Sequence, residues 1–220
     1  EQEALLDRYY EKAFIPAAHQ AGIRQVGVFK PVGNDTATDK CLYVVLPFAS
    51  TEQMIDLPFQ LEKNNEYITN GHDYINAPYT APPYARIECV LLKAFKTAPV
   101  MQLPRLQSAK AEHIYELRSY EGHTEKISQN KIHMFNEGGE VPLFKRLNFN
   151  AVFYGEVIAG SRMPNLMYMT SFENMQDRDD HWTTFRADSE WKSLSSKQEY
   201  QKNVSRSEII LMKAAPYSDY

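Results

Sequence analysis

The chain has 220 residues, which is enough for one large domain or two small ones, and 43% of them are hydrophobic while 24% are charged. This composition is that of a globular protein and excludes a disordered chain. The 24 lysines and arginines stand against 28 aspartates and glutamates, so the formal net charge is −4. The charge does not support a nucleic-acid partner, and no apolar stretch reaches the roughly 18 residues of a membrane span.

The first half of the chain predicts a helix, a hairpin, a second helix and a strand. Residues 5–17 carry apolar side chains at the i, i+4 spacing of an amphipathic helix. Strand-like runs follow at 26–29 and 42–48. Ser50, with a glutamine three residues later, is typical of the capping box that begins a helix. Residues 86–94 are then predicted to form the closing strand.

The second half repeats this order behind one additional strand. Its predicted elements are a strand at 113–120, a helix capped by Thr124, strands at 152–155 and 166–172, a helix capped by Asn174, and a closing strand at 206–214. The two closing strands are identical at five of nine positions. The order β-α-β-β-α-β defines a ferredoxin-like unit.

The opening strand of the first copy would precede Glu1. We expect residues upstream of this numbering to supply it, because its loss would leave backbone groups of the neighbouring strands unpaired. A leader removed just before that strand would indicate an exported protein, for instance a bacterial periplasmic one.

The repeat predicts the α+β class, with two tandem ferredoxin-like units at residues 1–96 and 113–220. A proline-containing linker of little periodicity occupies 97–112. Each sheet would be covered by helices on one face and bare on the other. Packing the two bare faces together would form a dimeric α/β-barrel within one chain, with a cavity or a packed core between the sheets. Further association into a homo-oligomer stays open.

Two motifs connect the second copy to a known family. The run Tyr115-Glu116-Leu117-Arg118-Ser119-Tyr120 and the run Asp188-Ser189-Glu190-Trp191 resemble the NIPSNAP family, and the resemblance covers about residues 113–215. It implies a dimeric α/β-barrel fold that is shared with monooxygenase-like and haem-handling relatives. It brings no catalytic residues, and those stay unknown.

The family resemblance leaves two readings of function open. The first is a small-molecule-binding or scaffold protein. The alternative is a cofactor-independent monooxygenase or isomerase that acts on a hydrophobic carbonyl compound in the barrel cavity.

Charged candidates for a ligand site follow from the alternation of side chains along strands. They are Glu116 and Arg118 on the opening strand of the second copy, Arg206 and Glu208 on its closing strand, and Arg86 and Glu88 on the closing strand of the first copy. If the first four converge, Arg118 or Arg206 could hold an anionic or carbonyl-bearing ligand, with Glu116 as a base. The alternative is cross-strand ion pairs that set the register, or a rim open to water.

Three tyrosines on predicted strands, Tyr115, Tyr154 and Tyr168, could stack on a flat ligand in the cavity or simply pack in the core. The histidines have no metal-binding spacing, so we predict neither a metal site nor a cofactor. Haem is the alternative cofactor, with His133 or His181 as the helix-borne ligand.

Two other features have structural interpretations. Cys41 and Cys89 lie in strand-like runs without metal or redox spacing, which predicts small buried side chains. The segment Glu137-Gly138-Gly139-Glu140 is expected to interrupt the first helix of the second copy.

Overall fold

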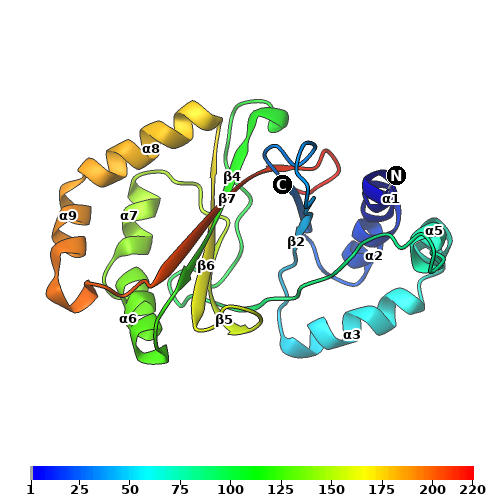
Figure 1. Ribbon diagram of the computed structural model, residues 1–220, viewed down its shortest axis with the longest axis horizontal. Coiled ribbons are helices and arrows are strands. Elements are labelled where there is room, and N and C mark those ends of the chain that lie inside the picture. The colour runs from blue at the N-terminus through cyan, green and yellow to red at the C-terminus, as the bar shows by residue number, and fades with distance from the viewer. Residues whose placement is uncertain (1) are drawn as a thin grey trace. The chain divides into compact units, whose positions relative to one another are not determined.

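A computed structural model describes residues 2–220, so Glu1, where the predicted first unit begins, lies outside the described residues. The chain forms two units, and neither is continuous in sequence. Unit 1 comprises the residues up to 29 together with Leu42–Glu88 and Ala215–Tyr220, and unit 2 comprises Lys30–Cys41 and Cys89–Ala214. Helices and antiparallel strands are both present, which confirms the α+β class (Figure 1).

Unit 1 combines short helices with a two-stranded hairpin. The helices are α1 (Gln2–Tyr9), the π-helical turn η1 (Tyr10–Phe14), α2 (Ile15–Gln20), α3 (Thr51–Glu62), α4 (Asn65–Asn70) and α5 (His72–Ile75). β1 (Gly27–Pro31) pairs antiparallel with β2 (Tyr43–Val45), with Val28 opposite Val44. Val28 packs in one core with Ala18 of α2 and Leu57 of α3. The predicted first helix and hairpin are confirmed.

The predicted Ser50 cap at the start of α3 is confirmed, and the return bond of Gln53 goes to the residue before the cap. The Ser50 hydroxyl accepts a hydrogen bond from the backbone N–H of Gln53 at 3.3 Å, and the Gln53 side-chain oxygen accepts one from the N–H of Ala49 at 2.8 Å. Two N–H groups near this helix end are thereby satisfied.

Unit 2 contains a curled antiparallel sheet with the order β7-β4-β6-β5-β3. Its strands are β3 (Leu91–Ala94), β4 (Ile114–Glu121), β5 (Phe153–Ala159), β6 (Asn165–Phe172) and β7 (Arg206–Ala214). The opening strand β4 lies between β6 and the closing strand β7. This neighbour relation is that of the predicted ferredoxin-like unit.

Four helices cover one side of this sheet (Figure 1). They are α6 (Glu125–Asn136), α7 (Glu140–Arg146), α8 (Met175–Ala187) and α9 (Ser189–Ser196), and short 3-10 turns lie at η2 (Lys110–Glu112) and η3 (Gln198–Tyr200). The side chains of Thr124 and Asn174 accept hydrogen bonds from the third N–H of the helices that follow them, at 3.3 and 3.0 Å. Both predicted N-caps are therefore confirmed.

The glycine pair ends α6 and turns the chain into α7. Gly139 has a φ of +96°, in the left-handed region that favours glycine, and a Cβ at Gly138 would lie 2.5 Å from the carbonyl oxygen of Met134. The predicted interruption is confirmed. The turn makes Glu140 the first residue of α7 and buries its side chain.

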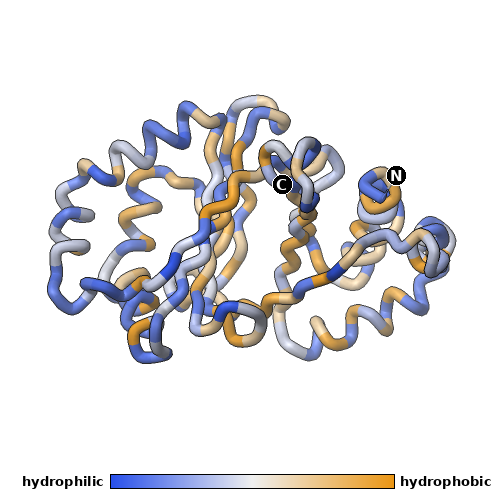
Figure 2. Tube along the Cα trace, in the orientation of Figure 1, coloured by the Kyte–Doolittle hydropathy of each residue, from blue (hydrophilic) through white to orange (hydrophobic). Residues whose placement is uncertain are grey.

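The two faces of the sheet separate the side chains of β4 by parity. Arg118 stands opposite Tyr168 on the helix-covered face, whereas Leu117 stands opposite Met169 on the other face. Between sheet and helices lies a core of aromatic rings, with Phe144 packed against Phe149 and Phe185 at centroid distances of 4.7 and 5.0 Å. Figure 2 shows the strands as largely hydrophobic, while much of α8 is hydrophilic.

The closing strand predicted at 86–94 is shorter than expected. β3 begins at Leu91, which pairs with Ala159 at the end of β5, so the preceding residues have no partner on β5. Arg86 and Glu88 therefore lie in an irregular, exposed segment and not on a strand. The predicted burial of the cysteines is also wrong. Cys41 and Cys89 lie just outside strands, and both are exposed free thiols.

Residues 89–112, predicted as closing strand and linker, belong to unit 2. The backbone N–H groups of Gln107 and Ser108 donate to the Glu173 carboxylate at 2.7–3.0 Å, which ties the segment to the loop before α8. Among residues 2–220, no helix has both the length and the apolar character needed to cross a membrane.

Candidate functional site

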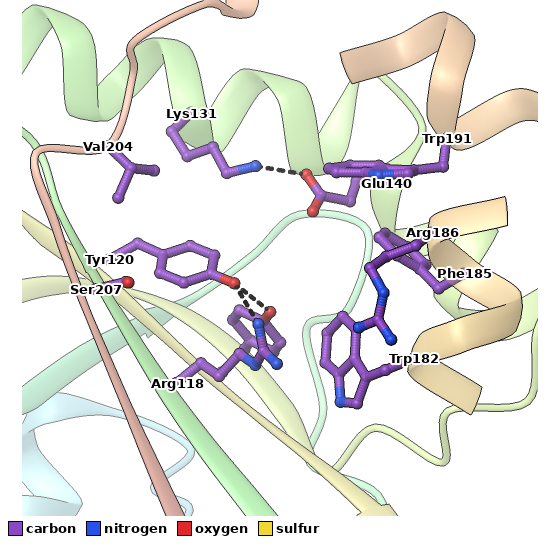
Figure 3. Close-up of a pocket in the computed structure, with 11 residues that line it drawn as sticks. Arg118, Tyr120, Lys131, Glu140, Trp182, Phe185, Arg186, Trp191, Val204 and Ser207 are labelled. Carbon is purple, nitrogen blue, oxygen red and sulfur yellow. Dashed lines mark hydrogen bonds and ion pairs between the residues drawn. The ribbon is translucent and has the colours of Figure 1, made fainter. Parts of the chain in front are cut away.

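A pocket of about 380 Å³ opens between the helix-covered face of the unit 2 sheet and the helices α6–α9 (Figure 3). The residues that line it are Arg118, Tyr120, Lys131, Glu140, Tyr168, Trp182, Phe185, Arg186, Trp191, Val204 and Ser207. This volume lies within the range of pockets that hold small molecules. We therefore consider this pocket as the candidate site.

A buried carboxylate beneath the pocket anchors its central arginine. Glu116 is fully buried, and its Oε1 accepts a hydrogen bond from Nε of Arg118 at 2.5 Å. Its Oε2 accepts two more, from Nε of Arg178 at 2.6 Å and from the indole N–H of Trp182 at 2.9 Å. Both oxygens are thus occupied, and the carboxylate holds three side chains from two elements in place.

The guanidinium of Arg118 lies at the bottom of the pocket, stacked 3.7 Å from the ring centre of Trp182. Its side chain is 13% exposed. Burial alone lowers the pKa of this group, but Tyr168, Tyr120 and Glu116 together raise it above its ordinary value. Arg118 is therefore a permanent cation in a largely dry environment.

Arg118 keeps hydrogen-bonding capacity for a ligand. Of its five N–H groups, Nε donates to Glu116 and one Nη1 proton donates to the Tyr120 hydroxyl at 3.0 Å, which leaves three with no partner among residues 2–220. The hydroxyls of Tyr120 and Tyr168 are 2.9 Å apart. Because one proton suffices for that bond, the second hydroxyl proton is also available.

A second charged pair forms another wall. Nζ of Lys131, on α6, donates to Oε2 of Glu140 at 2.8 Å, and the two side chains are 7% and 3% exposed. Burial raises the pKa of Glu140, and Lys131 partly opposes this change. Lys131 also faces aromatic rings, with Nζ 4.7 Å from the centre of Phe135.

The remaining walls are aromatic. Phe185 and Trp191, from α8 and α9, lie with ring centres 4.4 Å apart, and Trp182 lies beside Phe185 at 5.4 Å. The lining as a whole carries three cationic side chains but a single carboxylate, that of Glu140. The pocket therefore combines flat apolar surface with an excess of positive charge.

Comparison with known proteins identifies the part of the chain that holds this pocket. Residues 115–219 match the NIPSNAP family model, and every residue that lines the pocket falls within this range. This part of the chain belongs to the NIPSNAP family. No curated protein matches the chain by sequence.

Two solved structures resemble the NIPSNAP half. An uncharacterised NIPSNAP-like domain protein from Burkholderia xenovorans is 15% identical, with a TM-score of 0.45 over 50% of this chain and 91% of that chain. A NIPSNAP family protein from Agrobacterium tumefaciens is 18% identical, with a TM-score of 0.43 over 49% and 97%.

A third solved structure resembles most of the chain. A proposed monooxygenase from Lactobacillus acidophilus is 9% identical, with a TM-score of 0.54 over 86% of this chain and 76% of that chain. At this identity the likeness concerns the fold alone.

The pocket of the NIPSNAP domain includes two of the residues proposed from sequence, Arg118 and Tyr168. Glu116 lies beneath it, and Tyr154 stacks on Tyr168 with ring centres 5.7 Å apart. Tyr115 is buried on the opposite face of the sheet, where burial raises its pKa to about 12.

The expected convergence of four charged residues on β4 and β7 is wrong. Arg206 stands opposite Glu121 and Glu208 opposite Ser119, so both lie on the face away from Glu116 and Arg118. Arg206 is exposed and Glu208 pairs with Arg162 at the surface. The two charged residues of each strand do share a face, as predicted. The register between β4 and β7, however, places Arg206 and Glu208 on the opposite face from Glu116 and Arg118. Arg86 and Glu88 lie in the exposed segment before β3, and neither lines this pocket.

Sequence reasoning missed the partners that complete the site, above all Glu140, Trp182 and Arg178. One signal was present: Lys131 is a charged residue in the apolar stripe of its helix, which predicts a buried counter-ion. Its partner Glu140 is nine residues away, beyond the glycine turn. The contacts of Arg178 and Trp182 depend on how α8 lies on the sheet.

The histidines considered for haem do not fit this pocket. Nδ1 of His133 lies 2.9 Å from the hydroxyl of Tyr200, and Nδ1 of His181 lies 2.8 Å from the carbonyl oxygen of Asp177. Neither residue is part of the lining. Within residues 2–220, no group of three or more metal-binding side chains gathers.

Proposed function

We propose that the NIPSNAP domain binds a small anionic molecule with a flat apolar body. Arg118 carries this proposal, because it is a permanent, mostly buried cation with unused N–H groups at the bottom of an aromatic pocket. A carboxylate would accept two parallel hydrogen bonds from such a guanidinium. The rings of Trp182, Phe185 and Trp191 would cover the apolar part of the ligand.

Charge supports an anionic ligand over a neutral one. The lining has three cationic side chains and a single carboxylate, that of Glu140. Below it, Arg118 shares Glu116 with Arg178, which also pairs with Asp179. Burying an uncompensated charge is unfavourable, and a ligand anion would remove that penalty.

The two tryptophans of the chain, Trp182 and Trp191, both line the pocket, so intrinsic fluorescence reports its occupancy directly. Phenylacetate and its uncharged amide, phenylacetamide, are matched probes of charge at nearly constant shape. We expect phenylacetate to change the fluorescence in a saturable manner. Phenylacetamide should bind at least about tenfold more weakly, because it lacks the charge that strengthens the hydrogen bonds to Arg118.

Variants separate the role of Arg118 from that of general surface charge. Arg118→Gln is expected to abolish the preference for phenylacetate, whereas Arg146→Gln, a surface arginine of the same unit, should keep it. Equal affinity for both probes would refute an anionic ligand. No binding of either would refute the proposal and favour the scaffold reading.

Turnover of a hydrophobic carbonyl compound is the second candidate function. The observation that favours it is the group of donors formed by Arg118 and the hydroxyls of Tyr120 and Tyr168, which could stabilise negative charge on a carbonyl oxygen. Oxygen uptake on addition of an enolisable aromatic ketone would support the monooxygenase form of this candidate. Proton exchange without oxygen uptake would support the isomerase form.

A further inference from the structure

Inside the pocket, one carboxylate oxygen that is available to a ligand faces a group of hydrogen-bond donors. Glu140 uses Oε2 to accept from Lys131, and its Oε1 has no hydrogen-bond partner within residues 2–220. In Figure 3 the Glu140 carboxylate and the Arg118 guanidinium come from different walls and both reach into the pocket. A bound molecule would thus meet a potential base on one side and donors on the other.

The donors suit an oxygen on which negative charge develops. The three unused N–H groups of Arg118 and the remaining hydroxyl proton of the Tyr120–Tyr168 pair lie at the same end of the pocket. Burial raises the pKa of Tyr168 well above its ordinary value, so its hydroxyl stays protonated. Preorganised donors of this kind stabilise an enolate in a site with little water.

We propose that this pocket catalyses the keto–enol tautomerisation of an aromatic 2-oxo acid, with Glu140 as the catalytic base. The inference rests on the proposed binding of a small anion. The ligand carboxylate and carbonyl oxygen would face Arg118, and the aromatic ring would lie against Trp182 and Trp191.

The reaction needs no cofactor. Glu140 takes a proton from the carbon next to the carbonyl group, and the C–H electron pair becomes the carbon–carbon double bond of the enolate. The carbonyl electron pair moves onto oxygen, where Arg118 and the tyrosine hydroxyl stabilise it. The oxygen then takes up a proton from water while Glu140 releases its proton to water, which gives the enol, or Glu140 returns its proton to carbon. Substrate and product have the same atoms and the same oxidation state.

The surroundings of Glu140 favour this role. A base acts best when its pKa approaches the working pH, and burial shifts the pKa of this carboxyl upward from 4.5. Glu116 is a poorer candidate, because three donors occupy its oxygens and it does not line the pocket.

Exchange of the methylene protons of phenylpyruvate in deuterated buffer, followed by proton NMR, tests the inference. We expect the wild-type protein to exchange them faster than buffer alone. Glu140→Gln keeps an oxygen acceptor for Lys131 but cannot take up a proton, and it should lose about 100-fold or more of the protein-dependent rate. Glu199→Gln, an exposed carboxylate outside the lining, should keep the rate.

Tryptophan fluorescence on the same samples separates binding from catalysis. We expect phenylpyruvate to bind Glu140→Gln within a few-fold of its wild-type affinity, and this saturable signal also shows that the variant is folded. Binding to wild type without exchange above background would overturn the inference and leave the proposed function standing. Full exchange by Glu140→Gln would likewise overturn it. No binding of phenylpyruvate, phenylacetate or phenylacetamide would overturn both.

Discussion

Replacing Glu116 by glutamine is expected to destabilise unit 2 by about 3 kcal/mol. The carboxylate is fully buried and is the shared counter-ion of Arg118 and Arg178, whose side chains are 13% and 19% exposed. Glutamine preserves the shape but removes the charge and turns an N–H₂ group toward donors. Two partly buried guanidinium groups then lose their common partner.

The magnitude follows from this geometry. Removing one partner of a buried ion pair costs about 3–5 kcal/mol, and the lower end applies here because both arginines retain some contact with solvent and the amide oxygen still accepts one hydrogen bond. For a chain of this size, such a loss corresponds to a fall in Tm of roughly 6–12 °C.

Urea unfolding followed by tryptophan fluorescence measures this effect in the relevant unit, because both tryptophans lie in unit 2. Glu208→Gln is the matched control. It removes a carboxylate from a surface pair with Arg162, which should change the stability by less than about 1 kcal/mol.

Two outcomes would refute the reasoning. A loss below about 1 kcal/mol for Glu116→Gln would mean that the arginines find other partners or water at little penalty. A loss equal to that of Glu208→Gln would mean that burial of the network has no energetic consequence.

Three further predictions concern single positions. Gly139→Ala should destabilise unit 2 by about 1–2 kcal/mol in urea unfolding, because its φ of +96° is strained for alanine although no atom would contact the added Cβ; an unchanged midpoint would contradict this. The Arg146 guanidinium holds the pKa of Asp188 below its ordinary value of 3.8. The ionised Asp188 carboxylate therefore stabilises the folded state above pH 3.8, and this stabilisation is lost as the pH falls below 3.8. Asp188→Asn should therefore show a shallower loss of stability in acid, and an identical acid titration would disprove the coupling. Finally, Cys41 and Cys89 should both react with a thiol reagent in the native protein. A cysteine that reacts only after denaturation would contradict their exposure.

Much of the fold could be read from the sequence because its signals are local. Ser50, Thr124 and Asn174 each begin a helix through a side chain that bonds an N–H three residues later, so the interaction is encoded within one turn. The glycine turn before Glu140 is similar, since a left-handed backbone is a property of the residue itself. Repetition of these local signals predicted the order of elements in both halves.

The site could be read only in part, because its contacts join distant segments. Strand alternation correctly put Glu116 and Arg118 on one face. It could not reveal that Arg178 and Trp182 would bond to Glu116 across more than sixty residues, since that depends on where α8 crosses the sheet.

Register decided what alternation alone could not. Arg206 and Glu208 share parity with each other, but a shift of one residue in the pairing of β7 with β4 exchanges the faces, and the observed register places them away from Arg118. In the same way, β3 begins only where β5 offers a partner, which leaves Arg86 outside the strand. Local chemistry in the sequence thus determined which elements form and in what order. Which side chains meet was decided by tertiary structure, because pairing partners and helix positions are set by contacts far apart in the chain.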